Sequence, residues 1–60
     1  MTPTATLTDH GDGLESMLVI GPDGRATLTT WLHSVEVETL AGTASDPDDP
    51  ATFKADNDNF

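Results

Sequence analysis

The four residues Gly-Pro-Asp-Gly at positions 21–24 constrain this chain more than any other stretch, because they separate two apolar segments. Proline presets φ for the second position of a turn, and Asp-Gly supplies a residue that tolerates positive φ. The segment before the turn, residues 15–20, is apolar and partly β-branched, and Arg-Ala-Thr-Leu-Thr follows it. The sequence therefore predicts a β-hairpin with its turn at residues 22–24.

A further strand is predicted near the start of the chain. In TPTATLTD, Ala5 and Leu7 alternate with threonines, which is the period of a half-buried strand. The stretch HGDG then reverses the chain ahead of residues 15–20.

Residues 30–41 leave two alternatives open. The alternation in VEVET favours a strand. However, the chain has no glycine or proline between Arg25 and Gly42, so no turn is signalled between two antiparallel strands here. A helix over residues 30–41 has an N-cap candidate in Thr29 or Thr30, and Gly42 follows its end. The prediction favours the helix, although its two valines are poor helix formers.

The last 18 residues have a different composition. They are acidic, polar and proline-bearing, which is typical of irregular chain. One short turn is expected, because Asp49 can cap it and Pro50 suits its first position, with Phe53 beside it.

The predicted fold is α+β: an antiparallel hairpin sheet of two or three strands with one short helix over residues 1–42, and an acidic, partly irregular tail over residues 43–60.

The charge narrows the range of partners. Eleven acidic residues face one lysine, Lys54, and one arginine, Arg25, for a net charge of -9. This balance favours a basic protein partner and disfavours direct binding to nucleic acid or to an anionic membrane.

The N-terminal segment lacks the basic and apolar regions of a signal peptide, and no apolar run approaches the ~18 residues of a membrane span. The absence of cysteine fits a cytoplasmic protein.

A chain of 60 residues without disulfides is expected to be marginally stable alone, so self-association or a partner is expected to support it.

Its three serines lack the Gly-x-Ser-x-Gly pattern of a nucleophile elbow, so catalysis is not expected. His10 with Asp9 and Asp12 falls short of a structural metal site. A calcium loop starting at Asp46 would need glycine and glutamate where the chain has alanine and asparagine. The sequence predicts neither a metal nor another cofactor.

The predicted partner-binding residues are acids and aromatics. Side chains two residues apart on an extended strand lie about 6.6 Å from each other, which is comparable to successive phosphates. Trp31 is either a core anchor or an interface residue, and Phe53 with Phe60 gives the tail the character of an acidic-aromatic docking peptide. The predicted set is Glu36, Glu38, Asp46, Asp48, Asp49, Asp56, Asp58, Phe53 and Trp31.

In length, acidity and absence of cysteine, the chain resembles the small acidic phage-encoded inhibitors of the anti-CRISPR and anti-restriction kind. The resemblance includes no motif and assigns no residue a role. It implies a non-enzymatic inhibitor, acting in the bacterial cytoplasm, that binds a nucleic-acid-handling protein or ribonucleoprotein complex by mimicking phosphates.

Two other functions remain open on the sequence. One is an accessory subunit that docks by its hairpin and Trp31, with a tail that only solubilises it. The other is a precursor peptide processed near its C-terminus. Mimicry predicts binding that collapses with salt, whereas an accessory subunit predicts an apolar contact with weak salt dependence.

Overall fold

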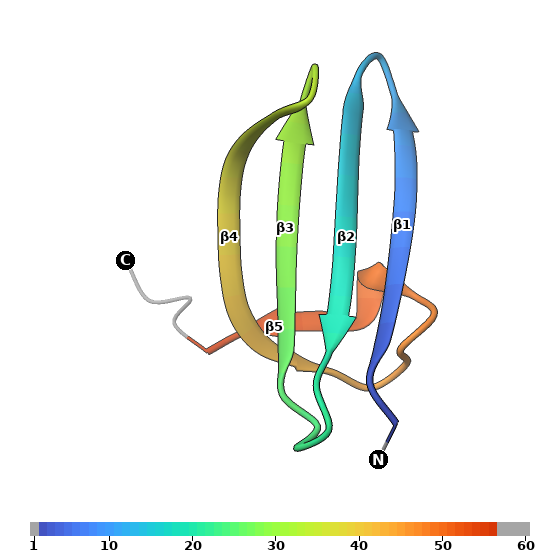
Figure 1. Ribbon diagram of the computed structural model, residues 1–60, viewed down its shortest axis with the longest axis vertical. Helices are drawn as coiled ribbons and strands as arrows, with labels where there is room; N and C mark the ends of the chain where they lie inside the picture. Colours follow the sequence, from blue (N-terminus) through green and yellow to red (C-terminus); the bar gives the residue numbers. More distant parts are fainter. Residues whose placement is uncertain (1, 57–60) are drawn as a thin grey trace.

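The computed structural model describes residues 2–56, which form one antiparallel sheet in the order β1-β2-β3-β4-β5 (Figure 1). The elements are β1 (Thr4–Gly11), β2 (Leu14–Ile20), β3 (Ala26–Leu32), β4 (Val35–Ala44), a 3-10 turn η1 (Pro50–Thr52) and β5 (Phe53–Ala55). The predicted α+β class is wrong. Within residues 2–56 the sheet has five strands rather than two or three, and η1 is the only helical element.

The two turns signalled by glycine form as predicted. An Asp-Gly pair at residues 12 and 13, with φ of 55° and 81°, joins β1 to β2. In the next turn, the Gly24 N–H donates to the Gly21 carbonyl over 3.0 Å, and Gly24 has φ of 85°. Ile20 then pairs with Ala26 across the strands. The hairpin predicted around residues 22–24 is therefore confirmed.

The predicted helix over residues 30–41 is absent, because β3 and β4 meet there in a third hairpin. Its two-residue turn consists of His33 and Ser34, with φ of 52° and 68°. Left-handed conformations cost a non-glycine residue roughly 1–2 kcal/mol, so a glycine was the expected signal. The turn is held partly by the His33 N–H, which donates to the Gly13 carbonyl over 2.8 Å. The β-branched residues that weakened the helix prediction lie in the strands.

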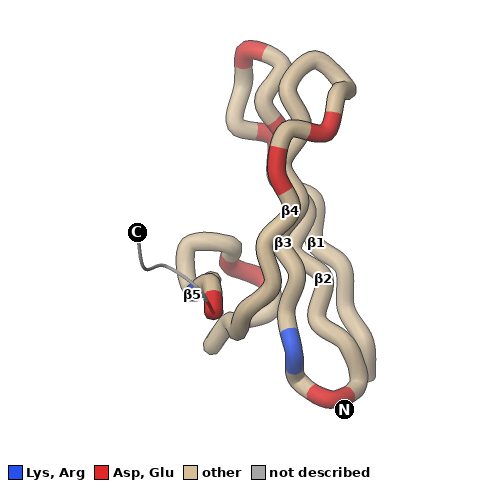
Figure 2. Tube along the Cα trace, turned by 90° about the vertical axis from the view of Figure 1, so that its left-hand side faces the viewer, with Lys and Arg blue, Asp and Glu red and all other residues tan. Residues whose placement is uncertain are grey.

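Strand pairing divides the sheet into two faces. The covered face carries Leu18, Ile20 and Ala26, and the open face carries Met17 and Val19 on the alternate positions. β4 curves strongly and leads into the crossover that returns over the lower half of the covered face (Figure 1). An edge-on view shows β5 standing away from β1–β4 on one side, with the hairpin ends projecting above it (Figure 2).

The core is very small. Among the described residues, only Leu18, Ile20 and Ala26 are buried apolar side chains, and Leu18 is 0% exposed. Leu28, Ala44 and Phe53 pack against these three. Four strands extend beyond this cluster, and no other element between residues 2 and 56 covers either face of their upper ends (Figure 2).

The segment predicted as an irregular tail is partly built into the sheet. β4 continues through Ala44 and so crosses the predicted boundary between residues 42 and 43. Asp49 caps η1, its carboxylate accepting from the Ala51 N–H over 3.0 Å, and Pro50 is the first residue of the turn. This confirms the predicted short turn. Phe53 begins β5 and packs on the core.

Replacing Gly42 with alanine is expected to loosen β5. A Cβ at this position would lie 2.8 Å from the Lys54 carbonyl carbon and 2.9 Å from the Ala55 Cα, and backbone cannot move aside cheaply. We expect the free energy of unfolding to fall by about 1–3 kcal/mol, measured by urea denaturation. Gly21→Ala is the matched control, because its Cβ would lie 3.2 Å from the Asp23 carboxylate and 3.9 Å from the Arg25 carbonyl oxygen, with no backbone atom closer. Equal losses in the two variants would contradict this assignment.

Candidate functional site

A row of four side chains crosses the open face near the hairpin ends. Asp9 on β1 pairs with Glu15 on β2, Glu15 with Trp31 on β3, and Trp31 with Glu36 on β4. Neighbouring strands lie about 4.8 Å apart, so these residues form a continuous line. We call it the Trp31 row: Asp9, Glu15, Trp31 and Glu36.

A bulge decides which glutamate of β4 joins this row. The register shifts between Thr30 and Trp31, so that Thr30 pairs with Glu38 while Trp31 pairs with Glu36. The two glutamates therefore do not share one face, as regular alternation had predicted. The Glu36 carboxylate also accepts a hydrogen bond of 3.1 Å from the Thr39 hydroxyl, which helps to position it.

The hairpin ends concentrate negative charge. Figure 2 shows acidic segments at both upper hairpins and a basic segment near the opposite end. The five acids there are Asp9, Asp12, Glu15, Glu36 and Glu38. Of the two basic residues of the chain, Arg25 follows the β2–β3 turn, where it forms an exposed ion pair with Asp56, and Lys54 lies in β5. Within the described residues, neither cation offsets the carboxylates at the hairpin ends.

A hollow of about 280 Å³ lies beside Trp31 on the open face. It is lined by Leu7, Glu15, Trp31 and Ser34. Leu7 lies diagonally across from Glu15 and is 61% exposed. The hollow thus combines an indole, an alkyl side chain and a carboxylate at the edge of the apolar part of the sheet.

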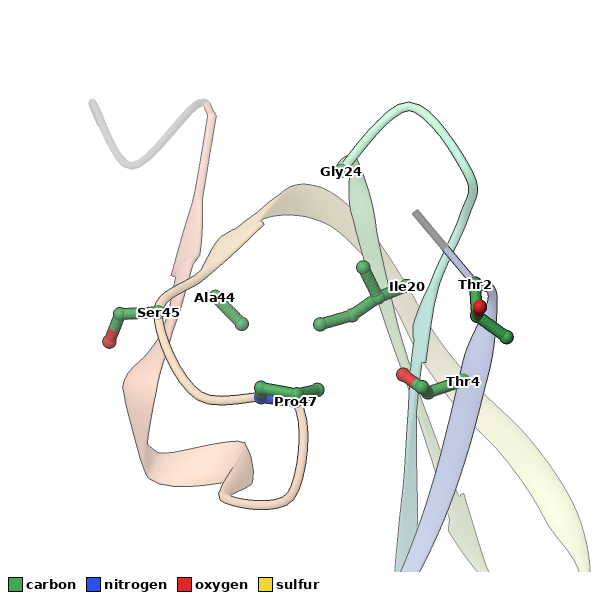
Figure 3. A pocket seen from close by; sticks show the side chains of 7 residues that line it. All are labelled: Thr2, Thr4, Ile20, Gly24, Ala44, Ser45 and Pro47. Carbon is green, nitrogen blue, oxygen red and sulfur yellow. The ribbon is translucent and has the colours of Figure 1, made fainter.

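A second hollow, of about 220 Å³, lies at the other end of the sheet between β1 and the crossover (Figure 3). Figure 3 shows Thr4 and Ile20 on one side and Pro47 with Ala44 on the other. The Thr4 hydroxyl oxygen is buried and has no hydrogen-bond partner among the residues that the structure describes. Among the described residues, no charged side chain lines this hollow.

Sequence reasoning missed a polar contact on the covered face. His10 Nε2 lies 3.1 Å from the Ser16 hydroxyl, which lies 3.4 Å from the Thr30 hydroxyl. A serine beside a histidine has two components of a nucleophilic site, but Ser16 is buried and lines neither hollow described above. The contact satisfies a hydroxyl that would be costly to bury unpaired. Within residues 2–56, no three His, Asp or Glu side chains gather as metal ligands.

The residues predicted to bind a partner do not form one surface. Trp31 and Glu36 share the Trp31 row, whereas Glu38 lies on the other face. Three aspartates, Asp46, Asp48 and Asp49, lie in the crossover, where two of them accept local backbone hydrogen bonds. Asp58 and Phe60 lie outside the described residues. Asp9 and Glu15 were missed, since only the strand register places them beside Trp31.

Comparison with known proteins finds no relative of this chain. The chain matches no protein-family profile, no curated protein and no solved structure. None of the helical segments described is long and apolar enough to cross a membrane.

The contact between His10 and Ser16 is expected to stabilise the β1–β2 hairpin. His10→Ala leaves the buried Ser16 hydroxyl with only its 3.4 Å contact to the Thr30 hydroxyl, and should lower the free energy of unfolding by about 0.5–1.5 kcal/mol. In a Ser16→Ala background the same change should cost much less, because the hydroxyl that His10 contacts is already absent. Urea denaturation of the four proteins in this double-mutant cycle gives the coupling, and strictly additive losses would contradict it.

Proposed function

We propose that this chain is a non-enzymatic binding protein that inhibits a nucleic-acid-handling protein by occupying a basic groove with its acidic hairpin ends. The observation that carries the proposal is the placement of five carboxylates on one projecting end, with both basic residues elsewhere. Such an end attracts a positively charged groove and is repelled by nucleic acid itself.

The shape of this end supports the proposal. Two hairpins project beyond the core, and the His33 N–H to Gly13 carbonyl bond ties their turns together. A pre-organised pair of hairpins loses little conformational freedom on binding. The cross-strand row also presents Asp9, Glu15 and Glu36 along one line, as a phosphate backbone presents its charges.

An accessory subunit remains the second candidate, because one observation favours it. Leu14, Leu32 and Val35 pair across neighbouring strands at the same end and are 37%, 43% and 63% exposed. Contiguous exposed apolar side chains mark protein interfaces. Binding through them would be insensitive to salt, whereas binding through carboxylates weakens as salt screens the charges.

The test begins with capture from bacterial lysate at low salt, followed by affinity measurements on the purified partner. Neutralising the row with Asp9→Asn, Glu15→Gln and Glu36→Gln should weaken binding at least about tenfold, as expected when several charge contacts are lost together. It should also flatten the dependence on salt between about 50 and 200 mM. The matched control changes Asp46, Asp48 and Asp49 to Asn, which removes the same charge from the crossover and should change affinity much less.

Competition separates the two candidates. DNA or RNA bound by the same partner should displace the protein if it occupies the groove. Failure of excess nucleic acid to compete, with affinity unchanged by salt, would refute the proposal and favour the accessory subunit. Equal effects of the two triple variants would show that overall charge, rather than the hairpin ends, governs binding.

A further inference from the structure

We propose that the hollow beside Trp31 binds one arginine side chain presented by the partner. This inference rests on the proposed function in requiring a basic partner, and it names the contact by which that partner is recognised. The hollow consists of the Trp31 indole, the Leu7 side chain, the Glu15 carboxylate and Ser34.

The composition of the hollow matches the guanidinium group. An arginine stacks its planar cation on an indole and can donate two parallel hydrogen bonds to one carboxylate. Here Glu15 pairs directly with Trp31 across the strands, so ring and carboxylate lie side by side. Leu7, diagonal to Glu15, gives the methylene stem of an arginine an apolar surface. Lysine lacks the planar fork and is more strongly hydrated.

Charge complementarity at the Trp31 row requires a cation from outside. Asp9 lies opposite Glu15, and Glu36 lies on the other side of Trp31. Like charges directly opposite each other destabilise a sheet. The only arginine of the chain already pairs with Asp56 at the other end, so a second copy of this chain could supply its arginine only by breaking that pair.

The hollow is large enough to hold one arginine side chain. Its volume of about 280 Å³ lies just below the range of roughly 300–1,000 Å³ typical of pockets for drug-sized molecules. A helix laid across the open face would bury the carboxylates of the row against apolar side chains, at a high cost in desolvation. A single guanidinium instead pairs with the Glu15 carboxylate that lines the hollow.

The probe is a short blocked peptide, acetyl-Gly-Ser-Arg-Ser-Gly-amide, with matched peptides carrying lysine or the neutral isostere citrulline. Binding is followed on the intact protein by the fluorescence of Trp31, the sole tryptophan, and by NMR shifts of its indole N–H. We expect millimolar affinity for arginine and binding more than about fivefold weaker for citrulline, which loses the cation–π contact, worth about two- to fivefold alone, and also the charge pair with Glu15. Lysine should lie between the two.

Protein variants show whether the carboxylate beside the ring is responsible. Glu15→Gln should weaken arginine binding several-fold and narrow its advantage over citrulline to the roughly two- to fivefold that the cation–π contact supplies. Glu38→Gln is the matched control, because it removes the same charge at the same end but from the other face of the sheet. Trp31→Phe keeps an aromatic ring with a weaker attraction for cations, and should reduce the affinity without abolishing it.

Three results would overturn the proposal. The first is equal indole shifts with the arginine and citrulline peptides, or none with either. The second is equal weakening by Glu15→Gln and Glu38→Gln. The third is a dimer in analytical ultracentrifugation that shields Trp31 from added quencher, since a second copy would then occupy the hollow.

The outcomes also distinguish this inference from the proposed function. If binding to the captured partner depends on salt and on the Trp31 row but the peptides show no preference for arginine, the arginine site is wrong and the function stands. If the peptides show the preference but nucleic acid does not compete for the partner, the arginine site stands and the mimicry is wrong.

Discussion

The close approach of two backbones at Gly42 is the contact on which the rest of this structure depends. A sheet of four short strands has no second layer against which to bury its apolar face, and a chain of this length has little surplus stability. Because Gly42 lacks a side chain, β5 pairs tightly with β4, and Phe53 and Ala44 reach Leu18, Ile20 and Ala26. This places the packing at one end and leaves the hairpin ends free to carry charge.

Local sequence signals predicted the two hairpin turns that carry glycine and the short turn that begins at Asp49 and Pro50, but not the third hairpin. Asp-Gly at residues 12 and 13 and Gly-Pro-Asp-Gly at residues 21–24 gave the first two hairpins. The third was missed because His33 and Ser34 adopt left-handed conformations that neither residue favours alone. Tertiary pairing of β3 with β4 overrides that preference, and a single sequence gives no sign of such an override.

For a related reason, the sequence predicted only two of the four residues of the Trp31 row. Trp31 and Glu36 stood out by residue type and charge, but their association with Asp9 and Glu15 depends on the pairing of four strands and on a bulge in β4. A bulge shifts every later side chain to the opposite face. The acidic tail, by contrast, drew attention through its composition, although its described part is largely occupied with capping η1 and covering the core.

The acidic residues have a second effect, because several of them lie on the strands at the free edges of the sheet. Within residues 2–56, β1 has no neighbour on its outer side, and β4 pairs with β5 only from Gly42 to Ala44. Unpaired strand edges are templates for aggregation, and natural proteins protect them with charge. With Asp9 at one edge and Glu36 and Glu38 at the other, mutual repulsion keeps molecules from stacking edge to edge. The charges proposed to recognise a partner would then also keep this protein soluble until it meets one.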